Sequence, residues 1–145
     1  MATTITPFLW FDGNLEEAVQ FYSGVFKTQV ISQNPMSAEF EIEGQRFMGL
    51  NGGPTFKFNE AVSFFISVET QDEVDYYWNA LTANGGAEGQ CGWVKDKFGV
   101  SWQVIPKALG RLLGDPDRDR AQRVVQAMLK MHKIVIADLE KAAVS

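Results

Sequence analysis

Two stretches of the chain that begin 56 residues apart share one strand–cap–helix pattern. They are Ile5–Phe26 and Ala61–Leu81, and in each an apolar strand ends at a polar residue with Glu three positions later. The pairs Asn14/Glu17 and Thr70/Glu73 have the spacing of a capping box, in which side chains bond the free amide groups of a helix start. A repeated unit of this length predicts two similar halves that bury their apolar faces together.

Composition excludes several classes of protein. The chain has 145 residues, enough for one compact domain with a substantial core. A net charge of −5 argues against nucleic acid as a partner, because a phosphate binder needs a basic face. No segment approaches the roughly 18 apolar residues of a membrane helix, which predicts no membrane association. The start lacks a secretion signal and Cys91 is the single cysteine, so we expect a cytoplasmic protein.

The order of apolar segments predicts an α+β fold. Each half reads β-α-β-β-β, which gives two tandem units with eight main strands and helices outside curved mixed sheets. Seven of the eight predicted strands have bounds, which are residues 4–11, 29–32, 38–43 and 46–50 in the first half and 62–68, 91–95 and 100–106 in the second. The predicted helices cover residues 15–27 and 71–83.

The character of the chain changes after Pro106. The run Asp115–Asp117 predicts a helix start with Pro116 at the first helical position. One apolar stripe follows, made of Ala121, Val124, Val125, Met128 and Leu129, and a last helical run covers residues 135–143. Short helices need a packing surface. We therefore expect a paired domain over residues 1–107 (units of about 1–56 and 57–107), with a helical extension over 108–145 that packs on this domain or on a dimer partner.

Four separated segments resemble the PhnB-like branch of the vicinal oxygen chelate superfamily, which includes glyoxalase I, bleomycin-resistance proteins and extradiol dioxygenases. They are PFLWFDGNLEEAVQFY, NGGPTFKFNEAVSFFISV, CGWVKDKFGVSWQVIP and AQRVVQAMLKMHKIVIADLEKA. The resemblance implies that the two units curve around a cavity and that the protein is a homodimer, with the C-terminal helices at or near its interface. Members of this branch carry the label 3-demethylubiquinone-9 3-methyltransferase. The chain has no G-x-G run of the kind that binds S-adenosylmethionine, which argues against methyl transfer.

Metal-dependent members of the superfamily hold a divalent ion with His and Glu on the concave face. The resemblance carries these positions to Thr6 (or Pro7), Met48, Ser63 and Gln103. None is a histidine or a carboxylate, and neutral hydroxyl, thioether and amide groups do not make such a site. The one histidine, His132, lies in the C-terminal extension. We therefore expect no metal and no cofactor, which argues against a metal-dependent lyase or dioxygenase.

The same resemblance implies a set of residues that line the cavity and bind a ligand. They are Thr6, Phe8, Trp10, Met48, Ser63, Phe65, Cys91, Trp93 and Gln103. Alternation along the strand turns Trp102 toward the helix layer. Gln103 is either an amide that orients a polar ligand or a side chain bonded within the sheet. Aromatic residues line an apolar site or pack under the helices, and Cys91 is more simply a small buried thiol. Glu39 and Glu41 belong to a solvated strand face or supply the carboxylates of the site.

The first hypothesis is metal-independent binding of a small, partly apolar molecule in the concave cavity. The alternative is a lyase, isomerase or transferase that acts on a small metabolite through Gln103, Ser63 and a further group such as Cys91 or a glutamate. A third possibility is a structural dimer whose cavity is filled by its own side chains. The sequence assigns neither the ligand nor any catalytic residue.

Overall fold

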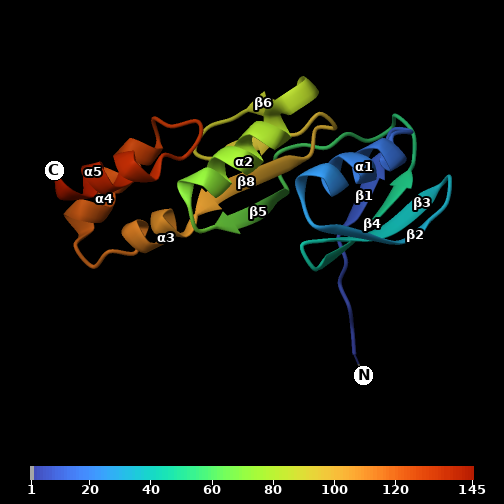
Figure 1. Ribbon diagram of the computed structural model, residues 1–145, viewed down its shortest axis with the longest axis horizontal. Helices are drawn as coiled ribbons and strands as arrows, with labels where there is room; N and C mark the ends of the chain where they lie inside the picture. The colour runs from blue at the N-terminus through green and yellow to red at the C-terminus, as the bar shows by residue number, and fades with distance from the viewer. Residues whose placement is uncertain (1) are drawn as a thin grey trace. The chain divides into compact units, whose positions relative to one another are not determined.

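The computed structural model describes residues 2–145, and the chain divides into two compact units. The first unit holds the described residues up to Phe58, and the second holds residues 59–145. Figure 1 shows one helix lying across the sheet of each unit. No helix in the described part of the chain is long and apolar enough to cross a membrane.

The first unit has the predicted order β-α-β-β-β. Its elements are β1 (Phe8–Phe11), α1 (Leu15–Val25), β2 (Thr28–Gln33), β3 (Ser37–Ile42) and β4 (Gln45–Asn51). The strands form a sheet in the order β1-β4-β3-β2, in which β1 and β4 are parallel and the other pairs antiparallel. Side chains alternate across this sheet, so that Leu9, Phe11 and Phe40 are buried with Leu15 and Tyr22 of α1.

The second unit repeats this topology. Its elements are β5 (Ser63–Val68), α2 (Gln71–Thr82), a 3₁₀ turn η1 (Ala83–Gly85), β6 (Ala87–Glu88), β7 (Trp93–Lys95) and β8 (Ser101–Pro106). The sheet order is β5-β8-β7-β6, again with one parallel pair, β5 and β8. The predicted α+β fold with two β-α-β-β-β units and eight strands is therefore confirmed.

The two predicted helix caps have different outcomes. Thr70 and Glu73 form the complete capping box at the start of α2, as predicted. The prediction for Asn14 is wrong, since its side chain makes no cap hydrogen bond. Asn51, at the end of β4, accepts the hydrogen bond from the Leu15 amide instead, at 2.9 Å. The side-chain amide of Asn51 also donates to the carbonyl of Pro35 at 3.0 Å, so it joins three parts of the first unit.

The C-terminal extension forms α3 (Lys107–Leu113), α4 (Arg118–Met128) and α5 (Ile136–Val144). The sequence analysis did not predict α3, and its prediction for the start of α4 is wrong. Pro116 lies outside the helix, and Asp117 is the cap, whose carboxylate accepts from the amides of Asp119 and Arg120.

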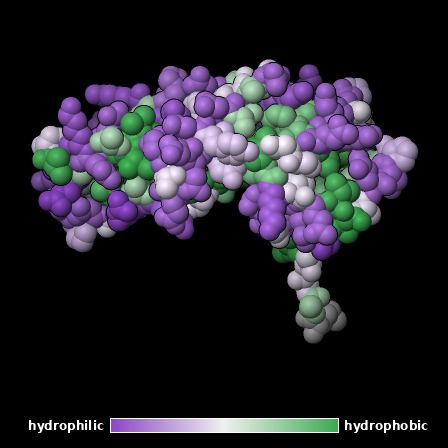
Figure 2. Space-filling model, in the orientation of Figure 1, coloured by the Kyte–Doolittle hydropathy of each residue, from purple (hydrophilic) through white to green (hydrophobic). Residues whose placement is uncertain are grey.

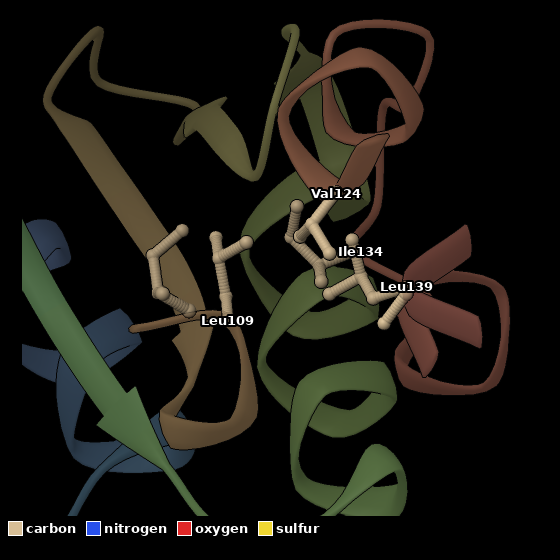
Figure 3. Packing of buried hydrophobic residues seen from close by; sticks show 6 residues of the cluster. Leu109, Val124, Ile134 and Leu139 are labelled. Atoms are coloured by element: carbon tan, nitrogen blue, oxygen red, sulfur yellow. The ribbon is translucent and has the colours of Figure 1, made fainter. Parts of the chain in front are cut away.

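The extension packs on its own unit around one apolar cluster (Figure 3). The buried members of this cluster are Ile105, Leu109, Val124, Ile134, Leu139 and Ala143. Val124 of the predicted stripe is fully buried, and Met128 packs against the cluster, while Leu129 is exposed. Most of the stripe is thus covered within the unit.

Polar contacts also hold the extension to α2. The Gln71 side chain donates to the carbonyl of Ile134 at 2.9 Å and accepts from the amide of Ile136 at 2.8 Å. Lys133 pairs with Asp75 at 2.8 Å. Because α5 has no side-chain cap of its own, Gln71 takes the place of one.

Candidate functional site

The sheet of the second unit has one face toward α2 and one face turned away, which we call the far face. Trp102 and Val104 of β8 are buried and α2 packs on this strand, which agrees with the predicted orientation of Trp102 toward the helix layer. Gln103 lies between them and projects to the far face. In register beside it are Phe65 of β5 and Trp93 of β7, so an amide stands between two aromatic side chains.

Phe65 is the most exposed member of this row. Its side chain is 60% exposed, although a large apolar residue on a strand is more often buried. Trp93 and Gln103 are partly exposed. The row therefore offers apolar surface on both sides of one hydrogen-bonding group.

Gln103 is anchored by a second predicted residue. Its Nε2 donates to the hydroxyl of Ser63 at 2.9 Å. This bond orients the amide and leaves the Oε1 acceptor directed elsewhere. Both alternatives for Gln103 are thus compatible with its geometry, since the side chain is bonded within the sheet and still exposes part of its surface.

A second row lies two residues earlier on β8; it contains Ser63 of the predicted site, whereas its other members, Ser101 and Lys95, were not predicted. Ser101 is in register with Ser63 on β5 and with Lys95 on β7. The Lys95 ammonium forms an ion pair with Glu60, which precedes β5. Ser101 lies two residues before Gln103 on β8, and Lys95 lies two residues after Trp93 on β7. Side chains two residues apart on a strand share a face, so strand periodicity was the signal that could have found Ser101 and Lys95.

In the first unit, the far face carries a separate apolar group. Phe8 and Trp10 of β1 lie opposite Met48 and Leu50 of β4 in the parallel register, and Phe8 is 53% exposed. Thr6 lies before the first residue of β1, because the strand starts four residues later than predicted.

A loop from the end of β4 holds Trp10 in place. The indole Nε1 donates to the carbonyl of Gly53 at 2.9 Å, and Phe56 meets the ring edge-on with centroids 4.9 Å apart. A Cβ at Gly52 would come within 2.3 Å of the same ring, so this position requires glycine. The loop thus covers part of Trp10.

Glu39 and Glu41 lie on the far face of the first sheet, and both pair with Arg46 of β4. The distances to the guanidinium nitrogens are 2.6 Å for Glu39 and 3.5 Å for Glu41. The hydrogen bond from Arg46 to Glu39 is the largest cause of a raised pKa for Arg46. Both carboxylates are therefore engaged by a permanent cation.

The first unit also has a pocket of about 430 Å³, and Glu41 is the one candidate residue of the sequence analysis that lines it. It lies where β2 begins and β3 ends, and its lining is mostly polar and charged: Lys27, Thr28, Gln29, Glu41, Glu43 and Gly44.

Cys91 is not brought to the row of Gln103. It lies in a turn before β7 with a positive φ of 55°, and not at the start of the strand as predicted. Its thiol donates to the carbonyl of Met128 at 3.5 Å, and its amide donates to that of Met131. His132 contacts the carbonyl of Gly89 in the same region. Cys91 therefore contacts the C-terminal extension.

The donor groups at the superfamily's metal positions do not fit a divalent ion. Thr6 and Met48 of the first unit offer a hydroxyl and a thioether. Ser63 and Gln103 of the second unit are bonded to each other. Across residues 2–145, no three His, Cys, Asp or Glu side chains are grouped so that they could hold a metal.

Comparison with known proteins identifies the family of this chain. A family model described as 3-demethylubiquinone-9 3-methyltransferase matches residues 3–105. No curated protein matches the chain.

Solved structures show the same fold. A putative 3-demethylubiquinone-9 3-methyltransferase, PhnB protein, from Bacillus cereus is 30% identical, with a TM-score of 0.65 over 72% of this chain and 99% of that one. Protein PA1353 from Pseudomonas aeruginosa is 23% identical, with a TM-score of 0.59 over 72% and 98% of the two chains. The fosfomycin resistance protein FosX from Listeria monocytogenes, solved with Mn(II) and sulfate, is 15% identical, with a TM-score of 0.57 over 73% and 91%. The chain therefore belongs to the PhnB-like 3-demethylubiquinone-9 3-methyltransferase family, whose fold is that of the glyoxalase/bleomycin resistance/dioxygenase proteins.

Proposed function

We propose that the far face of the second sheet binds a small, partly apolar molecule without a metal ion. The observation that carries this proposal is the row Phe65–Gln103–Trp93, in which a hydrogen-bonding amide is flanked by two aromatic side chains. Ligand sites combine apolar walls with a few placed polar groups. The exposure of Phe65 supports the proposal further, because a purely structural role would not require it.

The absence of a metal from this proposal rests on the donor chemistry of the chain. FosX, which shares the fold, was solved with Mn(II). In this chain the superfamily resemblance places Ser63 and Gln103 at metal-binding positions of the second unit, and they supply only neutral oxygen and nitrogen atoms. Methyl transfer, which the family's name describes, is not part of the proposal, because the chain has no G-x-G nucleotide turn.

A thermal-shift screen of metabolites tests the proposal, since a ligand at 100 times its Kd adds about 2.7 kcal/mol of stability. Compounds that stabilise the wild type should lose their effect in Phe65→Ala and Gln103→Leu. Tyr76→Ala is the matched control, because Tyr76 is an aromatic residue of α2 that is also about half exposed. A screen without any stabilising compound would contradict ligand binding.

Metal independence has its own test. Native mass spectrometry of protein purified without chelators should show the mass of the chain alone. Stoichiometric manganese, iron, nickel or zinc would contradict this part of the proposal.

A similar but separate proposal concerns the first unit, where Phe8, Trp10 and Met48 form an apolar platform on the far face. We propose that this platform also contacts a ligand. Phe8→Ser should abolish the thermal shift of any compound that uses it, and should leave compounds bound by the second unit unaffected.

We also propose that the protein is a cytoplasmic homodimer. The exposed apolar side chains of Val30, Ile31 and Met36, on and beside the edge strand β2, support the dimer. Figure 2 shows apolar patches within the mostly polar surface of this unit. Sedimentation velocity should give a dimer for the wild type and a monomer for Ile31→Lys. Ile5→Lys, which changes a residue that is already exposed, should stay dimeric, and a monomeric wild type at micromolar concentration would overturn the proposal.

A further inference from the structure

The buried hydroxyl of Ser101 is the one unsatisfied side-chain group found in the described part of the second unit. Only 1% of this residue is exposed, and its Oγ has no hydrogen-bond partner among residues 2–145. No other buried side-chain nitrogen or oxygen in that part of the chain lacks one. A buried hydroxyl without a partner destabilises a fold, so its presence calls for an explanation in terms of a group that it binds.

The neighbours of Ser101 are further hydrogen-bond donors. Ser63 stands beside it on β5, and Lys95 stands beside it on β7. Ser63 accepts from the amide of Gln103, which leaves its own hydrogen for another acceptor. The row Ser63–Ser101–Lys95 therefore combines two hydroxyl hydrogens with a positive charge, the donor set of a site for an anionic oxygen.

The ion pair of Lys95 does not close this row permanently. Its partner Glu60 and Lys95 itself have 62% and 42% of their side chains exposed. An exposed pair of this kind adds little stability and exchanges with water or another anion. A bound carboxylate can therefore replace Glu60 as the partner of the ammonium.

The two rows on the far face are two residues apart along β8, a distance of about 7 Å. We propose that the Ser63–Ser101–Lys95 row binds the carboxylate of a molecule whose flat apolar part lies over Gln103, between Phe65 and Trp93. The inference rests on the proposed function and names its ligand class, an aryl or arylalkyl carboxylate of this span. Ser101 and Lys95 are then the residues that select an acid over a neutral compound of the same shape.

Isothermal titration calorimetry with 4-phenylbutanoate and the matched neutral 4-phenylbutanamide tests this assignment. The wild type should bind the acid at least tenfold more tightly than the amide, because a hydrogen bond to a charged group contributes about a factor of ten or more. Ser101→Ala should remove about tenfold of this preference and leave the affinity for the amide unchanged. Ser67→Ala is the control on the same face of β5 and should change neither. Phe65→Ala should weaken both compounds.

The melting temperature of the ligand-free protein gives a second measurement. Ser101→Ala should melt no lower than the wild type, because the substitution removes a buried hydroxyl that has no partner. A clear fall in the melting temperature would mean that the hydroxyl has a structural partner, and would overturn the inference. Lys95→Met gives an independent comparison of acid and amide at a partly exposed position, and it should reduce the preference for the acid in the same way.

The outcomes separate this inference from the function on which it rests. Equal binding of acid and amide, or an acid preference that survives Ser101→Ala, overturns the carboxylate assignment and leaves small-molecule binding in place. If the screen yields only neutral ligands, the assignment is likewise wrong. If neither probe binds and the screen yields nothing, the proposed function and this inference fail together.

Discussion

Replacement of Asp96 is expected to destabilise the second unit more than any single change on its surface. Asp96 follows β7 and is only 2% exposed. One carboxylate oxygen accepts from the amides of Phe98 and Val100, at 2.9 and 3.1 Å. The other accepts from the indole nitrogen of Trp102 at 2.9 Å. This carboxylate thus fixes both the turn between β7 and β8 and the largest side chain on β8.

The magnitude follows from the donors that Asp96→Ala leaves behind. A buried donor that loses its partner costs about 1–3 kcal/mol. The Phe98 amide is partly exposed and is rehydrated, whereas those of Val100 and the Trp102 indole remain buried. We expect a loss of about 3–5 kcal/mol, a large part of the 5–15 kcal/mol typical of a domain.

Urea unfolding followed by tryptophan fluorescence measures this loss. Asp72→Ala, at an exposed position in the first turn of α2, is the matched control and should cost less than about 1 kcal/mol. The loss of stability in Asp96→Asn should lie between those of Asp96→Ala and Asp72→Ala. The asparagine keeps one acceptor oxygen but places an NH₂ group against one of the hydrogen-bond donors. Adding Trp102→Phe should reduce the effect of Asp96→Asn, since the indole donor is then gone. An Asp96→Ala variant within 1 kcal/mol of the wild type would refute the reasoning.

Three other predictions concern the connections within each unit. Asn51→Ala should destabilise the first unit by about 1–2 kcal/mol in urea unfolding, while Asn14→Ala should cost less than about 0.5 kcal/mol; equal effects would contradict the assignment of the α1 cap. Hydrogen bonds, first from Lys133 and then from Gln71, lower the pKa of Asp75 below its ordinary value of 3.8. The stability that this carboxylate adds is thus present above pH 3.8 and is lost as the pH falls through its lower pKa in the folded state. The difference in free energy of unfolding between the wild type and Asp75→Asn should therefore shrink between pH 7 and pH 3. A difference that stays constant over this range would argue against the pair of Lys133 and Asp75. Truncation after Pro106 removes most of the apolar cluster that covers Ile105 and should give an aggregating product in gel filtration, whereas a well-behaved soluble fragment would show that the extension is dispensable.

The fold was predictable because its signals are local. Alternation of side chains along a strand has a period of two whatever the neighbours are, so Trp102 and Gln103 could be assigned to opposite faces. The prediction of the capping box at Thr70 was right for the same reason, because Thr70 and Glu73 lie only three residues apart in the sequence. The cap of α1 failed because its acceptor comes from Asn51, 36 residues away.

The candidate site was predictable only in part. The resemblance led to Gln103 and Ser63, which the structure joins by a hydrogen bond, but it also led to Cys91, which lies against the C-terminal extension. A left-handed backbone at Cys91, a non-glycine residue, gave no signal in the sequence. Strand periodicity could have placed Ser101 on the same face as Gln103, but nothing in a sequence shows that a serine is buried without a partner.

The hydrogen bond between the Leu15 amide and Asn51 has a consequence for the order in which the protein is made. Residues 15–25 leave the ribosome before residue 51 does, so the first turn of α1 emerges before its final acceptor is free to pair with it. The helix therefore remains frayed at its start until β4 has been added to the sheet. In the finished protein, exchange of the Leu15 amide proton with solvent should accordingly report on the detachment of β4, and not on the opening of α1 alone.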